Sequence, residues 1–179
     1  MDNLHNFEKN INYIYMGKYI FDQYSLLHFT IGMVCRYFNF NLTFLFIFHI
    51  IFEYIENTKK GMHIINNYLK IWPGGKTSSD TFINSVSDII ISLIGWICMD
   101  FLIKRNMIKI GYEFSIGVLL YFLLYPNCGL PLCILISYII YNIYNYNVLY
   151  GFFLALLLDK IGLYFGYYPT HDNNKIFNF

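Results

Sequence analysis

Six apolar segments, separated by short polar breaks, follow one another along this chain of 179 residues. They cover residues 24–38, 42–55, 80–103, 112–125, 130–143 and 148–165. Apolar runs of this kind predict helices, and a helix that spans a bilayer needs about 20 such residues. The fourth and fifth segments reach that length only if flanking tyrosines complete them. We therefore expect an all-α fold, a multi-pass transmembrane helical bundle of about five to six helices.

Composition supports a membrane environment. Hydrophobic residues make up 57% of the chain and charged residues 13%, whereas about a quarter of the residues in an average soluble domain are charged. The net charge is +1, and no basic patch is interleaved with stacking aromatic residues, which argues against a nucleic-acid partner. We expect an integral membrane protein whose partners are membrane lipids.

A connection rich in lysine separates the second and third apolar segments. Residues 57–79 contain four lysines, and apolar side chains recur there at intervals of three and four, a pattern typical of a helix in the membrane interface. Thr77, Ser78 and Ser79 offer N-cap oxygens to a third long helix beginning near Asp80. The predicted organisation is an amphipathic N-terminal segment over 1–21, a single transmembrane domain over 22–168 and a polar tail over 169–179.

The first three apolar segments carry polar side chains at helical spacing. An ionisable group inside a membrane helix costs about 2.5 kcal/mol or more, so several together need mutual partners, a cation or water. If the first two helices form a hairpin, the start of the first, the end of the second and the start of the third share one membrane face. We expect six side chains to meet there in a one-sided polar site: His28, Glu53, Glu56, Asp80, Asn84 and Asp88.

The residue types of this predicted site suggest its chemistry. Clustered carboxylates repel one another unless a proton or a cation relieves them. Carboxylate and amide oxygens are the ligands that Ca²⁺ and Mg²⁺ prefer, so the sequence predicts that one of these ions is held by Glu53, Glu56, Asp80, Asn84 and Asp88. His28 then remains free to act as a general base toward a substrate hydroxyl, and Glu53 is the second catalytic candidate. Zinc is less expected, because only His28 and His49 offer nitrogen ligands.

A structural interpretation competes with this one. Polar residues near helix ends are hydrated, and Asn, Ser and His bridge membrane helices through hydrogen bonds worth about 0.6–2 kcal/mol each. Taken singly, Asn84 and His49 fit that interpretation better. Arg36 and Asp100 are expected to pair near the opposite membrane face. The convergence of six residues nevertheless favours a site.

The ordered motifs resemble those of an uncharacterised family of small membrane proteins from bacteria and large DNA viruses. The family pattern is D-x-Y-[ST]-x-x-H, then E-x-x-E-N-[ST], then D-[ST]-x-x-N-S-x-x-D. This chain matches it with Asp22 to His28, Glu53 to Thr58 and Asp80 to Asp88. That family is similar in turn to VanZ-like proteins, which are associated with glycopeptide resistance. The resemblance covers residues 22 to about 100.

A fainter similarity links the chain to base-exchange phosphatidylserine synthases, multi-pass enzymes that use Ca²⁺ to exchange phospholipid head groups. The resemblance implies that His28 is the base and that Glu53, Glu56 and Asp80 bind the ion or the phosphate. Asn84 and Asp88 would lie on the next turns of the same helix. This chain is much shorter than those enzymes and has Asn84 where they have an acid.

Three functions are consistent with the sequence. The first is an intramembrane enzyme that acts on phospholipid head groups or lipid-linked substrates with a divalent cation. The second is a non-catalytic, VanZ-like membrane protein in which the polar stripes pack helices or bind a lipid head group. Ion or proton transport ranks last, because the predicted site residues stay in one leaflet.

Overall fold

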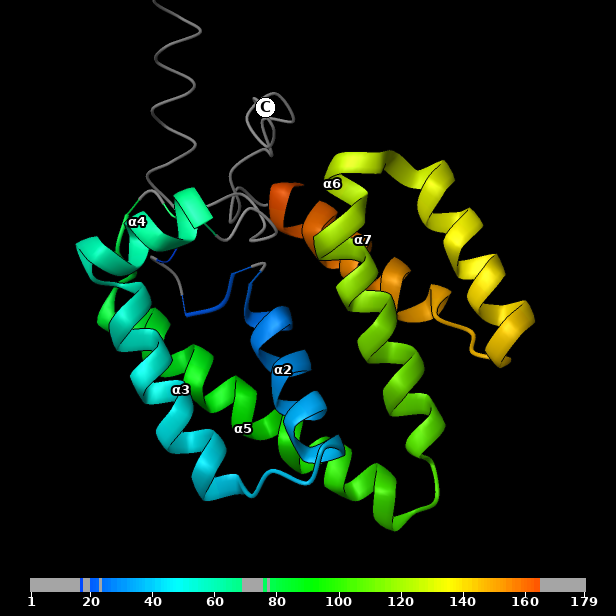
Figure 1. Ribbon diagram of the computed structural model, residues 1–179, viewed down its shortest axis with the longest axis horizontal. Coiled ribbons are helices and arrows are strands. Elements are labelled where there is room, and N and C mark those ends of the chain that lie inside the picture. Colours follow the sequence, from blue (N-terminus) through cyan, green and yellow to red (C-terminus); the bar gives the residue numbers. More distant parts are fainter. Residues whose placement is uncertain (1–16, 18–19, 23, 69–75, 77, 165–179) are drawn as a thin grey trace, which may run out of the picture.

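The computed structural model describes residues 17, 20–22, 24–68, 76 and 78–164, and this part of the chain is helical with no strand. The all-α prediction is therefore confirmed for these residues. The helices are α2 (Ser25–Tyr37), α3 (Leu42–Glu56), α4 (Lys59–Tyr68), α5 (Phe82–Lys104), α6 (Ile108–Tyr144) and α7 (Leu149–Tyr164) (Figure 1). The predicted N-terminal segment lies almost entirely outside the described residues, and the polar tail lies wholly outside them.

Within the described residues, two helical stretches are long and apolar enough to cross a membrane, Phe82–Lys104 and Ile108–Tyr125. Cys128–Tyr144 and Leu149–Leu158 are apolar but shorter. The first two predicted segments form α2 and α3, which have 13 and 15 residues, fewer than the roughly 20 that a full span requires.

Two asparagines shape the turn between α2 and α3. Asn39 adopts a left-handed conformation with φ 61°, which Asn tolerates better than most residues. The side chain of Asn41 caps α3 by accepting a hydrogen bond of 2.7 Å from the backbone N–H of Phe44. The polar turn between the two apolar segments thus makes α3 return antiparallel to α2.

The start of α5 differs from the prediction. Its N-cap is Thr81, whose side-chain oxygen accepts from the backbone N–H of Asn84 at 3.3 Å, and the helix begins at Phe82. The predicted start near Asp80, with Ser78 or Ser79 as caps, is therefore wrong by two to three residues. Thr77, the third predicted cap, lies outside the described residues.

The predicted fourth and fifth segments are joined in α6, which bends at Gly129 (φ 72°, ψ 171°). A side chain at this φ would be strained, so glycine permits the bend. Beyond the bend, the second half of α6 in Figure 1 reverses direction and runs back beside the first half. α7 then crosses the first half of α6 (Figure 1).

Two glycine pairs bring helices into close contact. A Cβ on Gly32 of α2 would collide with the carbonyl oxygen of Ser92, and one on Gly95 of α5 would collide with that of Phe29. In the same way, Gly117 of α6 and Gly151 of α7 lie against the backbone of the opposite helix. The molecule therefore has two tightly crossed helix pairs, α2 with α5 and α6 with α7.

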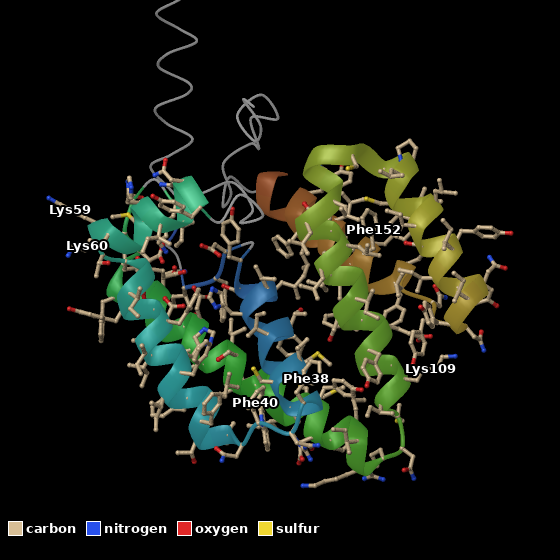
Figure 2. The ribbon with its side chains drawn as sticks, in the orientation of Figure 1. Phe38, Phe40, Lys59, Lys60, Lys109 and Phe152 are labelled. Carbon is tan, nitrogen blue, oxygen red and sulfur yellow. The ribbon has the colours of Figure 1, made fainter. Side chains whose placement is uncertain are left out.

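The two pairs occupy different halves of the molecule, with α2, α3, α4 and α5 on one side of Figure 1 and α6 and α7 on the other. Phe152 lies between α6 and α7 in Figure 2 and is fully buried, in a cluster with Val118, Tyr121 and Phe122. Lys59 and Lys60 point outward from α4 at one end of the bundle, while Phe38 and Phe40 lie at the other end (Figure 2).

Candidate functional site

The site lies where the start of α2, the end of α3 and the start of α5 meet. Asp22 holds the beginning of α2, because its carboxylate accepts hydrogen bonds from the backbone N–H groups of Tyr24 at 2.8 Å and Gly17 at 3.3 Å. Burial raises the pKa of Asp22 above its usual range, although these hydrogen bonds oppose the rise. The anchored first turn directs Ser25 and His28 toward α3 and α5.

Two imidazoles and a carboxylate form the centre of the site. His28 Nδ1 lies 2.8 Å from His49 Nε2, and Glu53 Oε1 lies 3.7 Å from the first atom and 3.5 Å from the second. The two rings meet edge to face, with 69° between their planes. The three side chains are almost wholly buried, Glu53 being 3% exposed. We refer to these three atoms as the imidazole–carboxylate triangle.

The other side of the His28 ring faces α5. His28 Nε2 lies 3.8 Å from Asp88 Oδ2, and Asp88 Oδ1 accepts a hydrogen bond of 2.8 Å from the Ser25 hydroxyl. Asp88 is 3% exposed. His28 therefore connects the triangle to a buried carboxylate that a serine orients.

A second cluster lies at the end of α3 and contains a lysine. Lys76 Nζ lies 2.6 Å from Glu56 Oε1 and also contacts Asp80. Burial alone lowers the pKa of Lys76, but the carboxylates of Glu56 and Asp80 outweigh it and hold that pKa above its ordinary value. Asn57 connects the helices here by accepting a hydrogen bond of 2.6 Å from the backbone N–H of Asp80.

Several buried atoms near these clusters have no hydrogen-bond partner. Within the described part of the chain they are His49 Nδ1, both carboxylate oxygens of Glu53, Glu56 Oε2 and Ser87 Oγ. Buried polar groups in proteins are nearly always hydrogen-bonded, so each exception needs a reason. All of these atoms belong to α3 and α5, on the side of the molecule that holds the site.

In the part of the chain that the structure describes, two groups of side chains are close enough to hold a metal ion, with ligand atoms within 4.8 Å of one another. One is His28, His49 and Glu53, and the other is Glu53, Glu56 and Asp80. Glu53 belongs to both. In the second group, Lys76 Nζ already lies between the carboxylates of Glu56 and Asp80.

The structure divides the predicted ligand set. Glu53, Glu56 and Asp80 lie together, whereas Asp88 lies on the far side of His28 and bonds to Ser25. Asn84 is 1% exposed and lies one helical turn before Asp88. It belongs to neither group of close ligand atoms, and its role as a ligand stays a prediction. His28, the predicted free base, is engaged at both ring nitrogens.

The triangle and the lysine cluster each contain one ionisable residue that was not predicted to belong to the site, His49 and Lys76. His49 lies four residues before Glu53 on α3, so helical spacing already placed His49 on the polar face of that helix. Its residue type alone favoured a structural role. Lys76 gave no comparable signal, because the lysines of residues 57–79 all resemble interfacial lysines. The predicted pair of Arg36 and Asp100 is confirmed at 2.8 Å.

An apolar groove of about 300 Å³ runs beside the site. Side chains of α2, α5, α6 and α7 line it, including Leu26, Phe122 and Ala155, and Asp22 and Ser25 lie at its polar part. Ser25 is the residue that donates to Asp88. The groove and the buried cluster therefore share a residue.

No protein-family model, no curated protein and no solved structure matches this chain.

Proposed function

We propose that this chain is a multi-pass integral membrane enzyme that acts on the head group of a membrane lipid at the junction of α2, α3 and α5. The observation that carries the proposal is the buried, incompletely satisfied set of ionisable side chains next to an apolar groove. Such a set is costly for folding, and perturbed ionisable groups gather at functional sites.

Exposed apolar surface supports the membrane assignment. One face of α5 exposes Ile90, Ile94, Ile97 and Phe101, each by at least 45%. The outer face of α3 is similar, with Phe44, Phe48 and Ile51 among its exposed side chains. Soluble monomers rarely expose continuous apolar surface of this extent, whereas lipid tails cover it without cost. The shorter helices α2 and α3 then hold the site near one face of the bilayer.

The groove favours a lipid as the substrate. Its lining is aliphatic and aromatic except at Asp22 and Ser25, so an acyl chain lying in it would direct its polar head toward those residues. Ser25 donates a hydrogen bond to Asp88, and the other carboxylate oxygen of Asp88 faces His28. A ligand site of this kind, with apolar walls and a few converging polar groups, is the usual form of a small-molecule pocket.

The reaction that fits these residues is transfer of a phospholipid head group. An incoming hydroxyl attacks the lipid phosphate, and its proton passes to the Asp88 carboxylate of the His28–Asp88 pair. The departing head-group alcohol takes a proton back as its bond to phosphorus breaks. The buried position of the pair excludes bulk water, which favours exchange over hydrolysis. A divalent cation near Glu53 would polarise the phosphate.

A non-catalytic role is the second candidate, and the network around Lys76 favours it. Glu56, Lys76, Asp80 and Asn57 join the end of α3 to the start of α5 through ion pairs and hydrogen bonds. Such contacts fix helix packing without any chemistry. They do not extend to the unpartnered oxygens of Glu53, which is why we place catalysis first.

The test is a lipid-turnover assay in vesicles of phosphatidylethanolamine, phosphatidylcholine and phosphatidylglycerol, with free serine, choline and divalent cations, followed by mass spectrometry of the lipids. We expect new head groups with the wild-type protein and at least a hundredfold loss with His28→Ala or Glu53→Gln. His63→Ala is the control, since His63 is exposed on α4. Equal turnover by all three variants would refute the proposed site, and no turnover by the wild type would favour the packing role.

A further inference from the structure

We infer that the imidazole–carboxylate triangle of His28, His49 and Glu53 binds one divalent transition-metal ion of the zinc class. The cation predicted from the sequence was Ca²⁺ or Mg²⁺ in a shell of carboxylates. The geometry instead assigns the ion to two nitrogens and one oxygen. The inference deepens the proposed function. The role of the ion in the reaction rests on that function, whereas the binding of the ion does not.

The size of the triangle fits a tetrahedral ion. With bonds of about 2.0–2.2 Å from zinc to His nitrogen and carboxylate oxygen, tetrahedral ligand atoms lie about 3.3 Å apart. The two separations to Glu53 Oε1 are 3.5 and 3.7 Å, and the separation between the imidazole nitrogens is 2.8 Å. A rotation of one ring that moves the nitrogens apart by about 0.5 Å would complete the geometry.

The charge at the triangle calls for a cation. Both oxygens of Glu53 are buried without a hydrogen-bond partner, and a buried carboxylate is stable only when it is paired. In the described part of the chain, the imidazoles of His28 and His49 are the basic groups within 4 Å of the Glu53 carboxylate, and each carries a positive charge only when protonated. The buried Lys76 contacts Glu56 and Asp80 instead. A metal ion would satisfy Glu53. It would replace the hydrogen bond of 2.8 Å that the two imidazole nitrogens share in its absence.

The donor types select the class of ion. Ca²⁺ takes six to eight oxygen ligands at about 2.3–2.6 Å, and Mg²⁺ also prefers oxygen. Imidazole nitrogens suit zinc and the neighbouring transition metals, and two histidines with one carboxylate form a known catalytic zinc set. The alternative group of Glu53, Glu56 and Asp80 would suit a hard cation, but Lys76 Nζ lies between two of its members.

The surroundings resemble the outer shell of a metal site. A histidine ligand usually presents its second nitrogen to a carboxylate, which fixes the ring. His28 Nε2 faces Asp88 at 3.8 Å, and Ser25 holds that carboxylate through a 2.8 Å hydrogen bond. Three protein ligands leave a fourth position open, as in catalytic zinc sites. The proposed function would fill that position with a phosphate oxygen of the lipid substrate.

Metal binding is measured on the full chain in detergent. The protein is freed of metal with a chelator and titrated with Zn²⁺, and in parallel with Co²⁺, whose visible absorption reports tetrahedral coordination. We expect one equivalent of either ion to bind the wild type and His63→Ala, and Glu53→Gln and His49→Ala to lose at least a hundredfold in affinity. Intense tetrahedral Co²⁺ bands in the wild type would support the site even if a variant failed to fold.

Asp88→Asn provides a graded test, since loss of such an outer-shell partner costs about 10–100-fold in metal affinity. No binding of Zn²⁺ or Co²⁺ by the wild type, wild-type affinity in Glu53→Gln, or displacement of Zn²⁺ by equimolar Ca²⁺ would each overturn the inference. Binding without lipid turnover would refute the proposed reaction and leave the metal site standing. Turnover by metal-free protein would support the proposed reaction and would refute a role for the ion in it.

Discussion

The crossing of α2 with α5 and the crossing of α6 with α7 are both built on a pair of glycines, yet the buried ionisable side chains gather mainly around the first. Around α6 and α7 the core consists of aromatic and aliphatic residues such as Val118 and Phe152. Around α2 and α5 it contains His28, His49 and Asp88. Close packing of helices in this protein therefore does not require a polar core.

The two halves also differ in how well their buried polar groups are satisfied. Glu113 of α6 accepts a hydrogen bond from the backbone N–H of Asn147 at 2.8 Å, and Ser137 donates to the carbonyl of Cys133 at 2.8 Å. Glu53 and Ser87, on α3 and α5, have side-chain oxygens without partners. Local rules of folding are broken mainly where function demands it, and the contrast therefore supports a functional site at α2, α3 and α5.

The largest expected effect concerns Lys76, the ion-paired residue beside the site. Lys76→Met leaves Glu56 buried and without its ion pair, and should lower the free energy of unfolding by about 3–5 kcal/mol. Because the pKa of Lys76 is raised, its contribution is present at neutral pH and is lost as the pH rises through that raised value. Unfolding in detergent at pH 7 and at alkaline pH measures both effects.

The control for Lys76 is Lys59→Met on the exposed end of α4, which should change stability by less than about 0.5 kcal/mol. Equal stability of the two variants at pH 7 would show that the pairing of Lys76 with Glu56 and Asp80 does not hold α3 against α5.

The two helix crossings should respond alike to overpacking. A Cβ at Gly95 or Gly151 would collide with backbone of the opposite helix, and Gly→Ala at either position should cost about 1–3 kcal/mol. Ile94→Ala, next to Gly95 and exposed, is the matched control with an effect below about 0.5 kcal/mol. If only one glycine were sensitive, the two crossings would not be equivalent.

The buried glutamates should respond with opposite signs. In metal-free protein, Glu53→Gln replaces a buried carboxylate whose oxygens have no hydrogen-bond partner and should raise stability by about 1 kcal/mol. Glu113→Gln weakens a charge-assisted hydrogen bond and should lower it by about 1.5–3 kcal/mol. Thermal unfolding in the presence of a chelator compares them directly. A loss of stability in Glu53→Gln equal to that in Glu113→Gln would make Glu53 a packing residue.

The buried serines give the smallest contrast. Ser137→Ala removes a hydrogen bond and should cost about 0.5–1.5 kcal/mol, whereas Ser87→Ala removes a hydroxyl without a partner and should leave stability unchanged or slightly higher. Chemical denaturation resolves differences of this size. Equal losses in both variants would indicate that Ser87 makes a hydrogen bond after all.

The sequence predicted the helices better than the contacts between their polar side chains. Apolar runs between breaks located α2, α3, α5 and α7, and helical spacing placed His28, Glu53 and Asp88 on faces that do meet. These features depend on local patterns that repeat along a helix. The bend at Gly129, which joins two predicted helices, depends on one backbone conformation, and spacing does not encode it.

The division of the polar side chains depends on contacts between distant segments. Asp88 pairs with Ser25 across 63 positions, and Lys76 reaches Glu56 from a connection whose lysines all resemble one another. Residue type favoured an oxygen shell, yet the side-chain directions on α2 and α3 bring two imidazole nitrogens together with Glu53. Only the packing of the helices decides which atoms face one another.

The most direct measurement of the central claim is the melting temperature of the wild type and Glu53→Gln in detergent with chelator, Ca²⁺, Mg²⁺ or Zn²⁺. A ligand bound only to the native state at 100 times its dissociation constant adds about 2.7 kcal/mol. We predict that Zn²⁺ raises the melting temperature of the wild type, that Ca²⁺ and Mg²⁺ do not, and that Glu53→Gln responds to none of them. The same melting temperature for the wild type in chelator and in Zn²⁺ would contradict a cation site at Glu53.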